Sequence, residues 1–226
     1  MEHSISHQPS FALLEIDLDA DESIKAEAGA MVSHTDGVDI ATDRGDDGLL
    51  GSIKRSVLGG ESFFQNTFTA PDGGHVTLAP PLPGDVTCHD LEGETLYVQS
   101  GSYLAADRSI SIDTEFGGAK SFFGGEGLFL LTLSGTGPTF LSSYGAIEER
   151  TLEPGDRYVV DTGHIVAFEE TLDFSVDRVG GLKSTLFSGE GLVCTFEGSG
   201  RLWLQSRSQD AFLSWLIPQL PTDDSS

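Results

Sequence analysis

Two glycine-rich stretches of the chain are near copies of each other. Residues 117–131 read GGAKSFFGGEGLFLL, residues 180–194 read GGLKSTLFSGEGLVC, and a shorter copy, GGESFF, covers residues 59–64. Paired glycines permit positive φ and close backbone approach, whereas aromatic side chains favour burial. Each copy therefore predicts a glycine turn, a buried aromatic anchor and a strand, and the recurrence predicts a fold built from repeats. The aromatic residues expected to be buried are Phe63, Phe122, Phe123 and Phe187.

Other features recur around these stretches in the same order. Before each copy, apolar residues alternate with polar ones and the segment ends at a glycine; after each copy comes a glycine turn and a further strand-like segment. The alternation predicts strands with one buried face, and glycine supplies the positive φ of tight hairpins. The preceding segments are residues 22–29, 94–101 and 156–163, and the later turns are residues 72–74, 135–137 and 198–200.

The pattern predicts one all-β domain over residues 8–207. Three related units are expected at approximately 11–86, 87–153 and 154–207, beginning with an alternating strand over residues 11–18. A chain of 226 residues is long enough to bury its core without a metal or a disulfide. The polar tail at residues 221–226 is expected to be disordered.

A short helix is expected at residues 208–220. Asp210 is placed to cap its N-terminus, and Phe212, Leu213, Leu216 and Ile217 would form an apolar stripe. A stripe of this kind is typical of a strap that closes an open end of a domain.

The chain is strongly acidic. It carries 36 Asp and Glu against 12 Lys and Arg, for a formal net charge of −24. Repulsion on this scale weakens a compact fold at low salt, whereas at molar salt the Debye length falls to roughly 3 Å. The composition resembles that of proteins from halophilic archaea and argues against nucleic-acid binding, which needs clustered basic residues. No basic segment followed by an apolar one opens the sequence and no apolar run approaches a membrane span, so a cytoplasmic protein is expected.

Several motifs carry a resemblance to a known family. The chain resembles the altered-inheritance-of-mitochondria protein 24 family, a member of which is associated with mitochondrial inner-membrane organisation. The resemblance implies a β-sandwich or β-barrel of the tryptophan RNA-binding attenuation protein-like superfamily, of double-stranded β-helix type, with three internal repeats in a pseudo-threefold arrangement. It implies no known reaction. The matching segments are residues 26–31, 60–64, 98–105, 124–128, 161–167 and 179–184.

Few residues suggest a chemical site, and no catalytic residue is assigned. His164 follows the recurrent glycine where the other units have Ala30 and Ser102, with Asp161 nearby. A histidine that forms a hydrogen bond at a strand end is the simpler interpretation. Tyr103 and Glu126 complete the set of ligand-binding candidates. Glu126 also recurs with Lys120, as Glu190 does with Lys183, which favours salt bridges between units.

Other motifs lack the spacing that their chemistry needs. No two of His34, His75, His89 and His164 have metal-ligand spacing, and Cys88 and Cys194 form no CxxC pair, so no metal or cofactor is expected and both cysteines are interpreted as core residues. The Cys88-His89-Asp90 run points to alternating faces of a strand. The glycines of residues 124–127 lack the Lys-Ser/Thr ending of a phosphate loop.

Two classes of function remain open. The first is a non-catalytic binding or scaffold protein, with an unknown protein partner or with self-association through repeated β surfaces. The second is a small-ligand-binding protein or an enzyme with a pocket between repeats, for which His164, Asp161, Tyr103 and Glu126 are the residues to check.

Overall fold

The structure is a computed structural model and describes residues 1–43, 57–58, 61–62, 65–113, 129–178 and 192–221. Most of the three glycine-rich stretches lies outside these ranges. The expectations for Phe63, Phe122, Phe123 and Phe187, and those for the Lys120–Glu126 and Lys183–Glu190 pairs, therefore concern residues outside the described ones.

The described chain is mostly β, as the alternating patterns predict, and its strands fall into three sets that follow the sequence. The first strand set has two layers. One layer has the order β1-β2-β9-β4 and the other contains β3, β8 and β5. The strands are β1 (Glu2–Ser6), β2 (Leu13–Leu18), β3 (Glu22–Glu27), β4 (Met31–His34), β5 (Asp39–Asp43), β8 (Gln65–Ala70) and β9 (Gly74–Leu78).

The alternation in β2 explains how the two layers of the first set pack. Leu14 and Ile16 are buried while Glu15 and Asp17 point outward, and the buried side chains pack in one core cluster with Ile24 from the opposite layer. The first set also contains β1, which precedes the expected start of the domain at residue 8. A two-stranded sheet of β6 (Val57–Leu58) and β7 (Glu61–Ser62) is described separately.

The second strand set is built on two long strands, β10 (Val86–Gln99) and β13 (Leu130–Ser142). They pair antiparallel from Val86↔Ser142 to Gln99↔Leu130, with an irregularity between Glu92 and Thr95. Gly93, Gly135 and Gly137 have positive φ around this irregularity. The glycine turn expected at residues 135–137 is wrong, because β13 runs through these residues as one strand. Two shorter strands, β11 (Tyr103–Asp107) and β12 (Ser111–Asp113), pair with β13.

The third strand set again has two layers. β14 (Ile147–Leu152), β19 (Gly200–Gln205) and β16 (Ile165–Glu169) form one, and β15 (Arg157–Asp161), β18 (Leu192–Gly198) and β17 (Leu172–Arg178) form the other. Phe168 contacts Phe174 and Phe196 between these layers, with ring centroids 5.0 Å apart in each pair.

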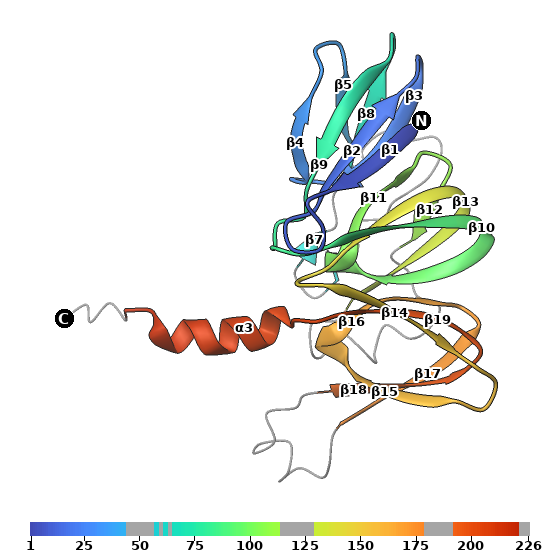
Figure 1. The fold of residues 1–226 in the computed structure, drawn as a ribbon, viewed down its shortest axis with the longest axis vertical. Helices are drawn as coiled ribbons and strands as arrows, with labels where there is room; N and C mark the ends of the chain where they lie inside the picture. The colour runs from blue at the N-terminus through green and yellow to red at the C-terminus, as the bar shows by residue number, and fades with distance from the viewer. Residues whose placement is uncertain (44–56, 59–60, 63–64, 114–128, 179–191, 222–226) are drawn as a thin grey trace.

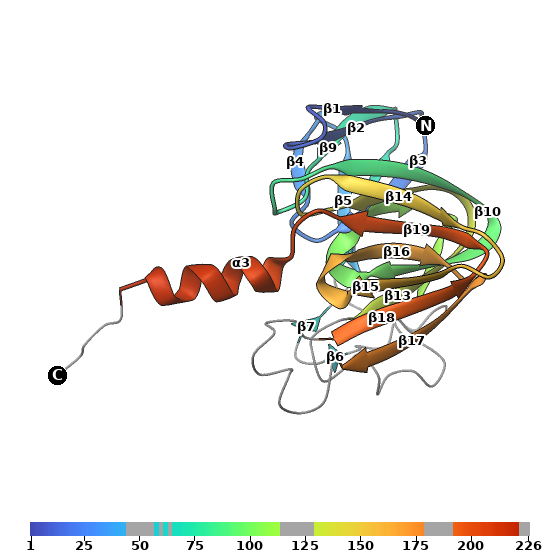
Figure 2. The ribbon, with the colours of Figure 1, turned by 60° about the horizontal axis from the view of Figure 1, so that its bottom comes forward.

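Two strand pairings join the three sets into one elongated body. β11 pairs antiparallel with β3, where Ala105 lies opposite Ala26, and β16 pairs antiparallel with β10, where Ala167 lies opposite Val98. Figures 1 and 2 show the sets stacked in chain order, with the first set at one end of the body and the third set at the other.

The C-terminal helix differs from its prediction in two respects. Helix α3 (Gln209–Leu216) is capped by Ser208, whose hydroxyl accepts a hydrogen bond from Ala211 N, and not by Asp210. A short 3-10 turn, η3 (Ile217–Gln219), follows it. The helix projects away from the β body in both ribbon views and has no buried residue, so it does not act as a strap across the domain (Figure 1).

Candidate functional site

Asp161 and His164 lie in one tight turn between β15 and β16. The turn is a 3-10 helix, η2 (Thr162–His164), and Asp161 Oδ1 accepts a hydrogen bond of 2.8 Å from Gly163 N. A Cβ on Gly163 would lie 2.7 Å from Ser208 Oγ and 3.2 Å from Asp161 Oδ1, which explains the glycine. Asp161 therefore shapes the turn, as an Asx cap does.

Gln205 holds this turn against the strand beside it. His164 Nδ1 lies 2.7 Å from the backbone oxygen of Gln205, which can only accept, so Nδ1 carries the proton. The Gln205 amide donates to Gly163 O at 2.8 Å, and its Oε1 accepts from Tyr144 N at 2.8 Å. These contacts match the simpler interpretation of His164 as a histidine that forms a hydrogen bond at a strand end.

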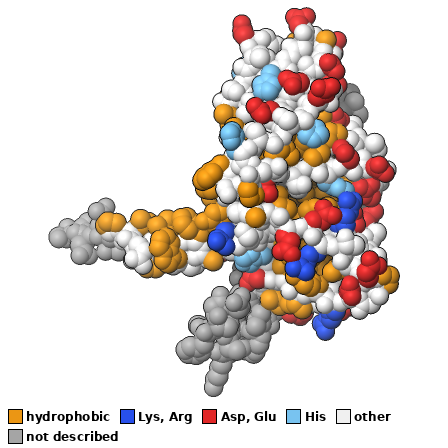
Figure 3. All heavy atoms as spheres, in the orientation of Figure 1, with side chains coloured by type: hydrophobic (Ala, Val, Ile, Leu, Met, Phe, Trp, Pro, Cys, Tyr) orange, Lys and Arg blue, Asp and Glu red, His pale blue; other side chains and the backbone are white. Residues whose placement is uncertain are grey.

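A shallow groove of about 320 Å³ lies between this turn and the start of α3. Tyr144 and Phe212 contact each other at its wall, with ring centroids 5.9 Å apart, and Phe212 continues to Trp215 at 6.1 Å. Arg207 brings a positive charge to the groove. Figure 3 shows acidic side chains over much of the β body. The groove thus combines an aromatic wall with one cation and one imidazole. Its lining residues are Tyr144, His164, Ser206, Arg207, Ser208, Ala211, Phe212 and Trp215.

The other two candidates do not join His164. Tyr103 is fully buried in the second strand set, and its hydroxyl donates to Lys25 O at 3.3 Å across the boundary with the first set. Burial raises the pKa of Tyr103, and the negative charge of Glu27 adds to the rise. Glu126 lies outside the described residues. Among the three candidates that the structure describes, Tyr103 therefore does not join His164 and Asp161 in one site.

A polar cluster around the buried His89 and Trp203, at the boundary between the second and third sets, was not predicted. Arg201 donates from Nε to Glu169 Oε1 at 2.6 Å and from its backbone N to Oε2 at 2.8 Å. Trp203 Nε1 donates to Glu149 Oε2 at 3.0 Å, and the His89 ring packs on the Trp203 ring at 5.1 Å. Arg201 and Trp203 are two residues apart on β19, so strand alternation alone could have placed them on the same face.

The environment of His89 disfavours the protonated form of its imidazole. Burial lowers the pKa of His89, and the nearby positive charge of Arg201 lowers it further, while Glu94, with Oε1 3.3 Å from His89 Nε2, opposes the shift. The cluster ties β10, β14, β16 and β19 together, which is a structural role.

The other two histidines considered as metal ligands, and the two cysteines, are also engaged structurally. His75 Nδ1 lies 2.8 Å from Asp17 Oδ1, and His34 Nδ1 lies 2.8 Å from Thr35 O. Burial raises the pKa of both Cys88 and Cys194 to about 12, so neither thiol is activated. In the part of the chain that the structure describes, no three His, Cys, Asp or Glu side chains are grouped to hold a metal ion.

No helix among the described residues is long and apolar enough to cross a bilayer.

These features define a mostly β protein of stacked antiparallel sheets with one projecting C-terminal helix. The chain belongs to the family described as Mitochondrial biogenesis AIM24, which it matches over residues 3–207. An uncharacterized protein of Streptococcus pyogenes is 33% identical over 229 residues, covering 98% of this chain and 92% of that protein. A crystal structure of a Streptococcus pyogenes protein has a TM-score of 0.82 and 32% identity, covering 97% of this chain and 99% of that one. Both relatives are streptococcal and give no support to the haloarchaeal source that the composition suggested.

Proposed function

We propose that this protein is a non-catalytic scaffold or binding protein made of three related β units. The observation that carries the proposal is that strands in corresponding places pair in the same way three times. The two long strands each take the place of two strands in the other sets. One group of pairings is β2 and β4 with β9, the first half of β10 and β11 with the second half of β13, and β14 and β16 with β19. The remaining strands pair likewise: β3 and β5 with β8, β10 and β12 with β13, and β15 and β17 with β18.

The irregularities in these pairings support the same units. The register shifts at the start of β4, β11 and β16. The shifts lie between Met31 and Ser33, between Tyr103 and Ala105, and between Ile165 and Ala167. The corresponding bulges favour units at residues 13–78, 86–142 and 147–205, with β14 in the third unit and not in the second. We further propose the pseudo-threefold, tryptophan RNA-binding attenuation protein-like arrangement that the family resemblance implies.

The non-catalytic part of the proposal rests on how the candidate residues are engaged. Asp161 caps a turn, His164 donates to a backbone oxygen, and Tyr103 donates to Lys25 O inside the body. A general base or nucleophile needs a partner and an accessible reacting position. These side chains are instead committed to backbone contacts that hold strands in place.

A thermal-shift screen against metals, nucleotides and amino acids in high-salt buffer tests this proposal. We expect no compound to raise the melting temperature. A saturable rise that His164→Ala removes, while His75→Ala keeps it, would contradict the non-catalytic scaffold. His75 is the matched control because its imidazole is also held by a hydrogen-bond partner, Asp17 Oδ1 at 2.8 Å, but lies on β9, outside the groove.

A small-ligand-binding role is the second candidate, and the groove beside α3 favours it. Its aromatic wall and Arg207 suit a flat apolar ligand with a negative group. Trp215 lines the groove and is 63% exposed, so ligand binding there would quench or shift its fluorescence. A fluorescence change that Arg207→Ala removes would favour this role over the scaffold.

The charge of the chain supports two further proposals about its surroundings. A formal net charge of −24 favours a protein that works at high salt and without nucleic-acid partners. We also propose a cytoplasmic protein, on the sequence patterns given above and not on the charge. The partner is then a protein or a further copy of the chain.

A further inference from the structure

The two joints between strand sets have one construction. At each joint, three strands of one set continue a layer of three strands from the next. The joint between the first and second sets reads β10-β13-β11 followed by β3-β8-β5, and the joint between the second and third reads β14-β19-β16 followed by β10-β13, with β12 on β13. β11 meets β3 at the first joint, and β16 meets the second half of β10 at the second. β11 and β16 occupy corresponding places in their sets, as do β3 and the second half of β10.

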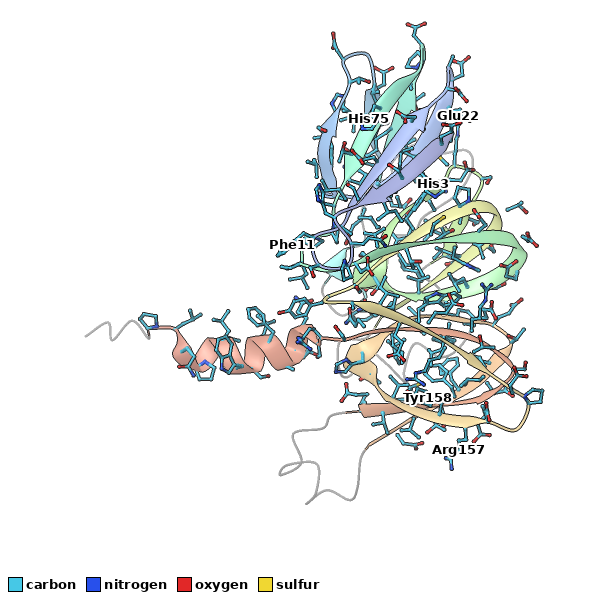
Figure 4. All side chains as sticks on the ribbon, viewed as in Figure 1. His3, Phe11, Glu22, His75, Arg157 and Tyr158 are labelled. Carbon is cyan, nitrogen blue, oxygen red and sulfur yellow. The ribbon has the colours of Figure 1, made fainter. Side chains whose placement is uncertain are left out.

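Each end of the body carries half of such a joint. The layer β1-β2-β9-β4 ends at β4, which has no strand on its outer edge among the described residues, and the layer β15-β18-β17 ends likewise at β15. Both ribbon views place these layers at opposite ends of the body, and Figure 4 shows Arg157 and Tyr158 of β15 at the end remote from His75 of β9.

Burial at the two kinds of edge differs sharply. Met31 and Val32 of β4 are 42% and 54% exposed, whereas their counterparts in β11 and β16 are at most 1% exposed. The counterparts of Met31 and Val32 are Tyr103 and Leu104 in β11, and Ile165 and Val166 in β16. At the other end of the body, Val159 of β15 is 55% exposed. An exposed apolar edge strand is a template for pairing with another chain, and neither β4 nor β15 contains the proline or lysine that commonly blocks such pairing.

We propose that β4 of one copy pairs antiparallel with β15 of a second copy, so that the two open layers complete a third joint. The proposal rests on the three related units proposed above, because the partner is chosen by their equivalence. The contact is head-to-tail, and such contacts close into a ring or extend into a filament according to the rotation at each step.

The two existing joints also predict the register. At the first joint Ala105 lies opposite Ala26 and Ala106 opposite Lys25; at the second, Ala167 lies opposite Val98 and Phe168 opposite Tyr97. Transferring both registers to the open edges gives the same result. Ser33 of one copy lies opposite Val160 of the second, and His34 lies opposite Val159.

Salt governs whether this contact forms. Each copy carries a formal charge of −24, so two copies repel at long range when the Debye length is about 10 Å, near 0.1 M salt. At roughly 1 M KCl the Debye length falls to about 3 Å, and the apolar edges are then free to pair. Assembly should therefore increase with salt and with protein concentration.

Sedimentation velocity with two edge variants tests the proposal. Val32→Lys places a charge on β4 and leaves β15 intact, while Val159→Lys does the reverse. In roughly 1 M KCl we expect the native chain to form assemblies, each variant alone to be monomeric, and a mixture of the two to form a one-to-one dimer that grows no further. Ile40→Lys is the matched control, because Ile40 is 44% exposed on β5, an edge strand outside the joint, and this variant should assemble like the native chain.

Three results would overturn the proposal: a native chain that stays monomeric in high salt, a variant that dimerises alone, and a mixture that stays monomeric. Melting curves establish that each lysine variant is folded; if either unfolds, Val32→Thr and Val159→Thr weaken the same edges. The ligand screen reports on the proposed function separately. A specific ligand with assembly intact would contradict the non-catalytic role alone, whereas a monomer that binds no ligand would contradict the head-to-tail contact alone.

Discussion

The Glu169 carboxylate accepts two hydrogen bonds from Arg201, one from Nε at 2.6 Å and one from the backbone N at 2.8 Å. The Glu169 carboxylate is largely buried, and the Arg201 guanidinium is partly exposed. Removing the carboxylate leaves the backbone N–H of Arg201 without its acceptor. We expect Glu169→Ala to lower the free energy of unfolding by about 2 kcal/mol, measured by denaturant titration.

The Arg157–Glu197 pair is the matched control for this prediction. Its atoms are 3.0 Å apart, but both side chains are more than half exposed. Exposed ion pairs contribute less than about 1 kcal/mol, so Glu197→Ala should cost less than that. A loss below about 1 kcal/mol from Glu169→Ala, no larger than that of the control, would show that the Glu169 contacts do not stabilise the third strand set.

Truncating the two tryptophans of the chain should change the free energy of unfolding by very different amounts. Trp203 is 2% exposed and packs against His89, whereas Trp215 is 63% exposed on α3. Trp203→Ala should therefore cost about 3–5 kcal/mol. Trp215→Ala should change the free energy of unfolding by no more than about 0.5 kcal/mol. A large loss from Trp215→Ala would show that α3 packs on the body.

Glu27 makes the stability of the fold depend on pH. Burial raises the pKa of this carboxyl from 4.5 to about 7. Since the folded state binds the proton more tightly, the stability from this group is fully present below about pH 4.5 and is lost as the pH rises through about 7. The free energy of unfolding of Glu27→Gln, minus that of the native chain, should rise between about pH 5 and pH 8.

Glu197→Gln serves as the control for Glu27, because it removes one exposed negative charge from the same protein. Subtracting its effect leaves the contribution of the buried site. A difference for Glu27→Gln that falls with rising pH would have the wrong sign for a carboxyl with a raised pKa.

Salt should stabilise the fold itself as well as its assembly. With 36 acidic against 12 basic side chains, the compact state gathers like charges that the unfolded chain spreads apart. The melting temperature of the monomeric Val32→Lys variant should therefore rise between roughly 0.1 and 1 M KCl. An isosmotic neutral solute separates screening from water activity. A flat or falling melting temperature would contradict the expectation of a high-salt protein.

Local patterns predicted much of the fold. The strand over residues 13–18 follows from its alternating apolar residues, and Gly73 and Gly198 have the positive φ expected of their turns, whereas Gly135 has it inside β13. β1 was missed because Ile5 is the only large apolar side chain in Glu2–Ser6, so its alternation is weak. Ser208 and Asp210 are both favourable N-cap residues, and the sequence alone does not decide which of them caps the helix.

Contacts between distant residues were not predictable in the same way. The pairing of β10 with β16 and the meeting of His89 with Trp203 depend on how the strand sets stack, which alternation within one strand does not record. His164 and Asp161 were placed together by their spacing, but the spacing did not reveal that Gln205 binds Gly163 and His164 of their turn. Tyr103 was named as a candidate beside them, but it lies at the boundary between the first and second sets.

A cross-linking measurement tests the head-to-tail register most directly. In the chain carrying both His34→Cys and Val159→Cys, a short thiol-reactive cross-linker in high-salt buffer should join copies into a ladder of covalent multimers, because the two residues lie opposite each other in the inferred pairing. Neither single variant should form the ladder, and Ser33→Cys with Val159→Cys should form it poorly, because a shift of one residue moves a side chain to the other face. A ladder of equal yield from the shifted pair, or none from the matched pair, would contradict the pairing of β4 with β15.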